Sequence, residues 1–164
     1  MVIRRMQPAD RAALEALLNR IENFTREEVQ VALELIDAAI RNPVESGYEV
    51  LVAEEPRAGG LCGYLCFGPT PLTDGTYDLY WIAVDPDRRG KGIGRHLHEA
   101  FVQELGTRGA RLVRLETSSQ DSYDGTMRFY EALGYRVVSR VPDFYRPGDD
   151  LFTLFLEVRG PDPG

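Results

Sequence analysis

A glycine-rich, basic stretch in the middle of the chain is the strongest candidate for chemistry. Gly90, Gly92 and Gly94 lie between a predicted strand and a predicted helix. Glycine leaves backbone N–H groups unscreened, and the first N–H groups of a helix have no partner inside the helix. Basic side chains surround these glycines in an otherwise acidic chain; they are Arg88, Arg89, Lys91 and Arg95. The stretch therefore predicts a phosphate or pyrophosphate site.

Two familiar phosphate-binding patterns do not fit this stretch. The P-loop pattern GxxxxGK[ST] does not occur in the sequence. The dinucleotide pattern GxGxxG fails because Leu97 stands where its third glycine belongs, and because four predicted strands precede the stretch. A glycine-rich turn with solvated arginines and no ligand is the remaining alternative.

The elements around the stretch predict an α/β domain with a mixed sheet. We expect strands at residues 2–6, 48–55, 61–68, 76–84, 110–117, 135–141 and 151–158. We expect helices at 9–20, after Thr25 up to Asn42, from about 95 to 105, and at 126–134, with a loop at 142–150. Short connections between the early strands predict antiparallel pairing, whereas strand–helix–strand order later in the chain predicts a parallel pair with helices on both faces.

Composition limits the classes of protein to consider. The 164 residues suit one domain over 1–164, and a net charge of -7 argues against nucleic-acid binding. We expect no membrane partner and a cytoplasmic location, because there is no long apolar run and no leader pattern at the start. Cys62 and Cys66 are expected to be buried apolar residues, and no ligand-like spacing predicts a metal site.

Two segments resemble motifs of the GNAT superfamily of N-acetyltransferases. VDPDRRGKGIGRHL, residues 84–97, resembles its acetyl-CoA-binding motif, and MRFYEALGYRVVSR, residues 127–140, resembles its FYxxLGF segment. The predicted order of elements matches this family over nearly the whole chain. The resemblance implies a mixed, mostly antiparallel sheet of six to seven strands with a central, splayed parallel pair.

The resemblance also implies which residues bind acetyl-CoA as co-substrate. Backbone groups of residues 82–84 would bind the pantetheine arm, and backbone amides of residues 90–95 would hold the pyrophosphate. Tyr123 stands where many members have asparagine, so the chain departs from the family at that contact. The cofactor-binding candidates are Ile82, Ala83, Val84, Arg89, Gly90, Lys91, Gly92, Ile93, Gly94, Arg95, Tyr123 and Tyr130.

Acetyl transfer from a thioester to an amine needs a base for the amine and an acid for the leaving thiolate. Tyr130 matches the family residue that protonates the thiolate; a core aromatic role is the alternative. Asp78 should share a strand face with Val84, six residues later, where several relatives carry a glutamate base. Glu116 matches a carboxylate of protein-acetylating relatives. Either acid is equally compatible with a solvated strand-end charge.

The acceptor is expected to be a primary amine, either a small molecule or a protein N-terminus or lysine. In the family, the first helices and the last hairpin wall the acceptor site. Acidic and aromatic residues of the last hairpin suit a cationic amine; they are Asp143, Phe144, Tyr145, Asp149 and Asp150. An ordinary hairpin turn over 146–149 explains the segment equally well. A non-catalytic acyl-CoA-binding module with the same fold is the rival reading, and the resemblance also allows a homodimer.

Overall fold

The computed structural model describes residues 1–57, 59–120 and 124–159. The strands are β1 (Val2–Arg5), β2 (Glu49–Glu54), β3 (Leu61–Pro69), β4 (Thr76–Val84), β5 (Leu112–Ser118), β6 (Arg136–Arg146) and β7 (Asp149–Glu157). The helices are α1 (Arg11–Asn19), α2 (Arg26–Arg41), α3 (Ile93–Thr107) and α4 (Asp124–Ala132), with short 3-10 turns η1 (Pro8–Asp10) and η2 (Pro86–Arg88). This order of strands and helices confirms the predicted one.

The strands form one seven-stranded mixed sheet in the order β1-β2-β3-β4-β5-β7-β6. Neighbours β1 and β2, β2 and β3, β5 and β7, and β6 and β7 are antiparallel. The β4–β5 pair is parallel, with register from Thr76↔Leu112 to Asp78↔Arg114. The predicted fold class is thereby confirmed. The chain divides into two compact units.

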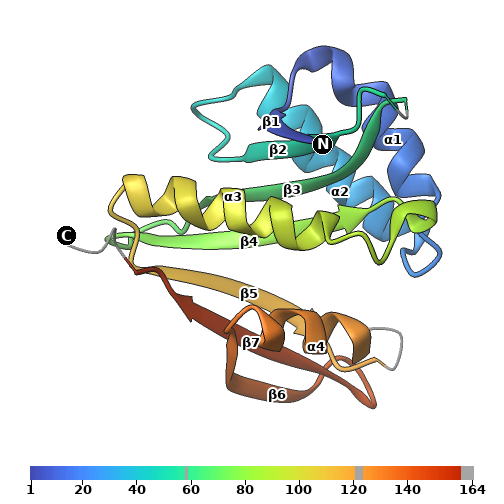
Figure 1. Ribbon diagram of the computed structural model, residues 1–164. Coiled ribbons are helices and arrows are strands. Elements are labelled where there is room, and N and C mark those ends of the chain that lie inside the picture. Colours follow the sequence, from blue (N-terminus) through green and yellow to red (C-terminus); the bar gives the residue numbers. More distant parts are fainter. Residues whose placement is uncertain (58, 121–123, 160–164) are drawn as a thin grey trace. The chain divides into compact units, whose positions relative to one another are not determined.

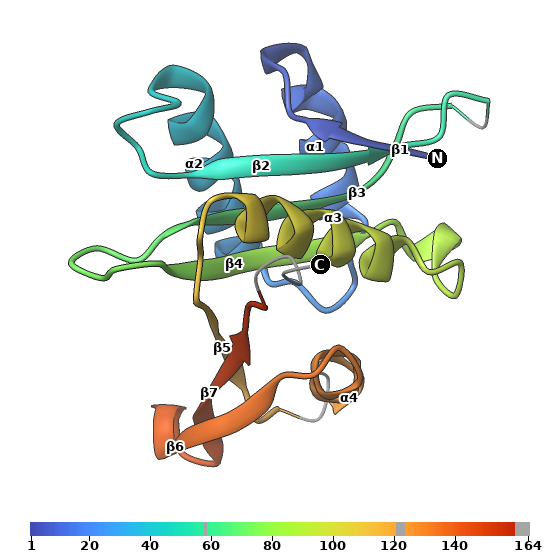
Figure 2. The ribbon, with the colours of Figure 1, turned by 60° about the vertical axis from the view of Figure 1, so that its left-hand side comes forward.

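Unit 1 comprises Met1–Pro69 and Leu79–Glu104, with helices on both faces of its strands. Alternation along β3 turns Tyr64 and Cys66 into the core cluster under α1 and α2. On the other face, the Phe67 ring lies 4.9 Å from the Phe101 ring of α3. Figures 1 and 2 both show α3 on the side of the strands opposite α1 and α2. Both faces of β3 are therefore buried.

Gly63 of β3 lets α3 approach the strands closely. A Cβ atom at this position would lie 2.9 Å from the Ala83 carbonyl oxygen and 3.1 Å from the Leu97 side chain. Leu97 is fully buried, so there is little room for it to move. Glycine is thus required here by the β4 backbone together with the side chains of α3, which no pattern in the sequence indicated.

The predicted start of α2 and the predicted state of the cysteines are both confirmed. Thr25 Oγ1 accepts from the Glu28 N–H at 3.1 Å, while Glu28 Oε2 accepts from the Thr25 N–H at 2.7 Å, which is a complete capping box. Cys62 and Cys66 are buried free thiols. Burial raises the pKa of the Cys66 thiol to about 12, so this thiol stays protonated near neutral pH.

Unit 2 comprises Thr70–Asp78 and the chain from Leu105 onward, and it corrects one prediction. Residues 142–150, expected as a loop, are mostly strand: β6 runs to Arg146, a turn occupies residues 147–148, and β7 starts at Asp149. The pairing register shifts between Val141 and Arg146, and Asp143 adopts a φ of 55°. A bulged strand with proline and acidic residues therefore looks like a loop in sequence. The expected turn over 146–149 is confirmed.

Candidate functional site

The predicted phosphate-binding stretch forms a tight turn in unit 1. β4 ends at Val84, η2 follows, and α3 begins at Ile93, two residues before its expected start. Gly90 and Gly92 have φ values of 80° and 74°, a backbone conformation that residues other than glycine rarely adopt. The His96 N–H donates to the Gly92 carbonyl at 3.0 Å, which marks the first turn of α3. Backbone N–H groups at the start of this helix are therefore available to an anion.

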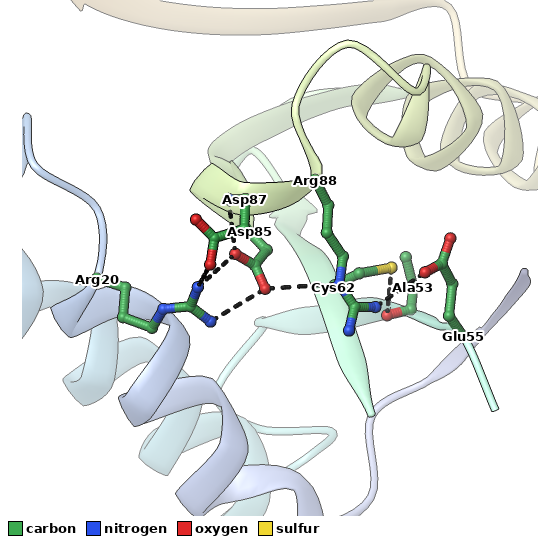
Figure 3. Close-up of polar contacts among 7 residues, drawn as sticks. All are labelled: Arg20, Ala53, Glu55, Cys62, Asp85, Asp87 and Arg88. Carbon is green, nitrogen blue, oxygen red and sulfur yellow. Dashed lines mark hydrogen bonds and ion pairs between the residues drawn. The ribbon is translucent and has the colours of Figure 1, made fainter. Parts of the chain in front are cut away.

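The basic residues of this stretch divide into two groups. Arg89, Lys91 and Arg95 are exposed, whereas the Arg88 side chain is only 16% exposed. Arg88 Nη1 lies 2.9 Å from Glu55 Oε2, and its Nε lies 3.7 Å from Asp85 Oδ2 (Figure 3). The grouping of Arg88 with the other three bases is therefore corrected, because its charge is paired inside unit 1.

Asp85, directly after β4, is a buried carboxylate that sequence reasoning missed. Its backbone N–H donates to the Cys62 carbonyl at 2.8 Å, and its Oδ1 accepts from the Asp87 N–H at 3.0 Å. Arg20, just beyond α1, contacts both carboxylate oxygens at 3.0 and 3.1 Å (Figure 3). No pattern could have paired residues 65 positions apart. The position of an aspartate at a strand end was the only signal.

The three strand residues expected to contact pantetheine precede this carboxylate. Ala83 is buried, while Ile82 and Val84 are partly exposed. The neighbouring Trp81 ring meets the Phe24 ring edge-on at 5.2 Å between centroids. The end of β4 is thus fixed on one side by the connection between α1 and α2.

Asp78 and Glu116 lie on one face of the strands of unit 2. Asp78 is buried, and its Oδ1 accepts from Arg114 Nε at 2.7 Å. Asp78 and Arg114 are register partners in the parallel pair, so their side chains point to the same face. Glu116 lies two residues further along β5, on that face, and is exposed. Arg114 is a second residue that the sequence analysis did not single out.

Tyr130 of α4 lies on the other face of β5. A Cβ atom at Gly134, just after α4, would lie 3.4 Å from the side chain of Leu156, whose register partner is Val113. Tyr130 is 6% exposed, and its ring centroid lies 5.4 Å from that of Tyr135. Burial raises the pKa of Tyr130 above its ordinary value, so its hydroxyl keeps its proton over the physiological range. α4 and the buried Tyr130 ring therefore lie on one face of the unit 2 strands, and the two carboxylates lie on the other.

The acidic residues of the last hairpin are mostly engaged with their neighbours. Asp150 is buried and accepts from Arg140 Nε at 2.6 Å and from the Asp143 N–H at 2.8 Å. Asp149 is buried as well and contacts the Ser118 hydroxyl. Tyr145 remains 45% exposed. The carboxylates expected to attract an acceptor thus bind the hairpin together.

Tyr123, the remaining cofactor-binding candidate, lies outside the described residues. His98 is buried, with its ring 5.9 Å from Phe101, and burial lowers its pKa to about 4. In the described ranges, no group of three or more His, Cys, Asp or Glu side chains could hold a metal ion. The helices within the same ranges are all too short or too polar to cross a membrane.

Comparison with known proteins identifies the family. The model of the acetyltransferase (GNAT) domain matches residues 46–137, more than half of the chain. A solved GNAT-family protein from Desulfovibrio desulfuricans is 40% identical with a TM-score of 0.91, and the match covers 96% of this chain and 99% of that one. A Salmonella typhimurium structure containing its cofactor acetyl-CoA is 27% identical with a TM-score of 0.71, over 100% and 99% of the two chains.

The curated relatives match over a shorter region. L-amino acid N-acyltransferase MnaT of Escherichia coli is 31% identical over 99 residues, which cover 59% of this chain and 55% of that protein. The match thus spans about half the length of this relative. Family model, fold and both motifs agree: the chain belongs to the GNAT acetyltransferase family.

Proposed function

We propose that residues 1–164 form one N-acetyltransferase domain that moves an acetyl group from acetyl-CoA to a primary amine. The observation that carries this proposal is the turn between β4 and α3. Gly90 and Gly92 keep its backbone open, the N-terminus of α3 follows, and three basic side chains are exposed around it. This combination suits the pyrophosphate of coenzyme A. The related Salmonella protein, solved with its cofactor acetyl-CoA, supports the choice of that ligand.

In this reaction the amine nitrogen attacks the thioester carbonyl carbon, the C–S bond breaks, and the amine loses a proton. A carboxylate near the amine receives that proton, either directly or through water. We assign this role to Asp78, because Arg114 holds its carboxylate in a defined orientation at 2.7 Å. Glu116, which is exposed on the same face, is the second candidate.

Tyr130 is assigned to the leaving sulfur. Because burial raises its pKa, its hydroxyl stays protonated and can donate a hydrogen bond. An ordinary thiol has a pKa of about 8.5, below that of tyrosine, so complete transfer from Tyr130 to the thiolate is uphill. Its role is therefore to donate a hydrogen bond to sulfur as negative charge develops there.

We rank a free α-amine above a protein lysine side chain as the proposed acceptor. The name of the Escherichia coli relative states that it acylates L-amino acids, which makes amino acids and their close analogues the first acceptors to assay. A peptide N-terminus offers the same α-amino group and comes next, and lysine side chains come last.

Two measurements test the proposal. Acetyl-CoA at about a hundred times its dissociation constant should add about 2.7 kcal/mol to the stability of the folded state. Gly92→Asp should abolish the resulting rise in Tm, because it strains a φ of 74° and repels phosphate. Gly109→Asp is the matched control, since Gly109 has a φ of 72° with open space around it. If millimolar acetyl-CoA does not raise the Tm of the wild-type protein, the proposal is contradicted.

Tyr130→Phe separates an enzyme from a binding module. An enzyme should lose roughly a hundredfold in kcat with an accepted amine while its affinity for acetyl-CoA stays unchanged. Tyr135→Phe removes a hydroxyl from the ring beside it and serves as control. Binding of acetyl-CoA without turnover of any α-amine would favour the non-catalytic module instead.

A further inference from the structure

A buried ionic network lies directly against the proposed pyrophosphate turn in unit 1. Its centre is Asp85, which is 4% exposed. A carboxylate removed from water is costly unless charged partners and hydrogen bonds satisfy it. Asp85 meets this requirement with two arginines from different parts of the chain and with the N–H of Asp87 (Figure 3). A buried carboxylate with this many partners at the end of a strand points to a role beyond local folding.

The two arginines connect Asp85 to separate elements. Arg20, just beyond α1, contacts both carboxylate oxygens of Asp85 and also contacts Asp87. Arg88, in η2, approaches Asp85 at 3.7 Å and pairs with Glu55, the residue after β2, at 2.9 Å. The end of β4, the η2 turn, α1 and the end of β2 are therefore held together by charge.

This network adjoins the glycines of the turn. Gly90 and Gly92 carry no side chain, and a Cβ atom at Gly90 would meet nothing within 4 Å. No neighbouring side chain therefore packs on the Cβ side of Gly90. On the helix side, Ile93 is 2% exposed and fixes the start of α3. On the strand side the fixed point is Asp85 with Arg88. The glycines lie between these two anchors, so the direction of their N–H groups depends on both.

Arg20 also begins the connection between α1 and α2. Ile21, the next residue, is buried, and Phe24 contacts Trp81 of β4. This connection thus meets the β4 end twice, through charge at Asp85 and through an aromatic pair at Trp81. A change at Arg20 should reach the turn although Arg20 lies well before it in sequence.

We propose that Asp85 is a positioning residue for the cofactor turn, and that Arg20 and Arg88 hold it so that the glycine N–H groups are preorganised for pyrophosphate. The proposal rests on the proposed function. It assigns different tasks to adjacent arginines: Arg88 braces the turn, and Arg89 stays exposed beside it. Preorganisation of this kind raises affinity by lowering the ordering cost of binding.

The test measures the dissociation constant of coenzyme A by calorimetry on folded protein. Asp85→Asn keeps the shape and the acceptor for the Asp87 N–H but loses the charge. Asp85→Asn and Arg20→Met should each weaken binding by about tenfold, and the double variant should be no weaker than the worse single one. Arg20→Lys should recover part of the loss. Arg11→Met is the matched control, because Arg11 lies on α1, the helix that ends just before Arg20, and forms an ion pair with Asp37 at 2.7 Å, away from the turn.

Amide hydrogen exchange gives a second readout that does not require ligand. Asp85→Asn should speed exchange at residues 85 and 88, whose N–H groups donate to the Cys62 and Asp85 carbonyls, whereas Arg11→Met should leave it unchanged. If wild type binds coenzyme A and both network variants bind equally well, the positioning role is wrong while the proposed function stands. Additive losses in the double variant would also overturn it. If wild type does not bind, both proposals fail.

Discussion

At the scale of single residues, the two candidate bases differ in how well they are held. Asp78 is buried and paired with Arg114, whose position across the parallel pair follows from the register. Glu116 is exposed on the same face. A base works best when its lone pair is fixed toward the proton that it takes, and fixing a side chain in advance removes a cost from the reaction. Asp78 is therefore the better held of the two carboxylates.

We predict that Asp78→Asn and Glu116→Gln, which both replace a carboxylate by an amide of the same shape, differ strongly in kcat. Asp78→Asn should lower kcat by about 10²–10⁴-fold with saturating acetyl-CoA, because the amide cannot accept the amine proton. Glu116→Gln should stay within about threefold of wild type. Release of coenzyme A thiol, followed with an accepted α-amine, measures both. The reverse ranking would transfer the role of base to Glu116.

The reach of sequence reasoning also differs from residue to residue. The glycines at 90 and 92 were recognisable because a positive φ and an open backbone require that residue type. Asp85 and Arg20 were not, because their pairing depends on where α1 ends relative to β4, which is a result of tertiary packing. Arg88 shows the same limit, since its type suggested phosphate binding while its neighbours direct it to Glu55.

At the scale of elements, predictions succeeded where periodicity and capping agreed. The predicted β4 at 76–84 and the predicted start of α2 after Thr25 are both observed. β6 continues to Arg146 despite Pro142, because Asp143 takes up a left-handed conformation and its N–H is satisfied by Asp150. Such compensation by a side chain of the partner strand is not visible in local propensity.

The link between β1 and the first turn of unit 1 gives a testable pH dependence. Arg4 donates to both oxygens of Asp10 at 2.8 and 2.9 Å, and the Gln7 N–H donates at 2.7 Å. The hydrogen bonds from Arg4 hold the pKa of Asp10 below its usual value. Because the folded-state pKa is lowered, the stabilisation is present above the unfolded pKa of about 3.9 and is lost as pH falls through the folded value.

Asp10→Asn should therefore lower the free energy of unfolding by about 1–3 kcal/mol at pH 7. The difference in free energy of unfolding between wild type and Asp10→Asn should stay constant down to about pH 5 and narrow below about pH 4. Urea unfolding at several pH values measures it, with Asp74→Asn at an exposed loop position as control. A gap that does not change with pH would show that shape, and not charge, stabilises this contact.

At the scale of the whole molecule, the sign of the charge opposes the proposed ligand. The chain carries a net charge of -7, and coenzyme A is itself an anion. The exposed bases of the turn must therefore produce a local positive potential within an acidic protein. Screening acts over about 10 Å at 0.1 M salt, so nearby charges dominate and distant acidic residues contribute little.

Lys91→Glu with Arg95→Glu should weaken coenzyme A binding by more than tenfold at low salt, and the loss should shrink as ionic strength rises to about 0.5 M. Arg41→Glu with Arg57→Glu is the matched control, since both arginines are exposed in unit 1. Each substitution changes the charge by two, so both double variants go from -7 to -11. Calorimetry at low and high salt separates them. If both lose affinity equally, total charge governs binding; a loss confined to the turn variant identifies the turn as the site that binds the phosphates.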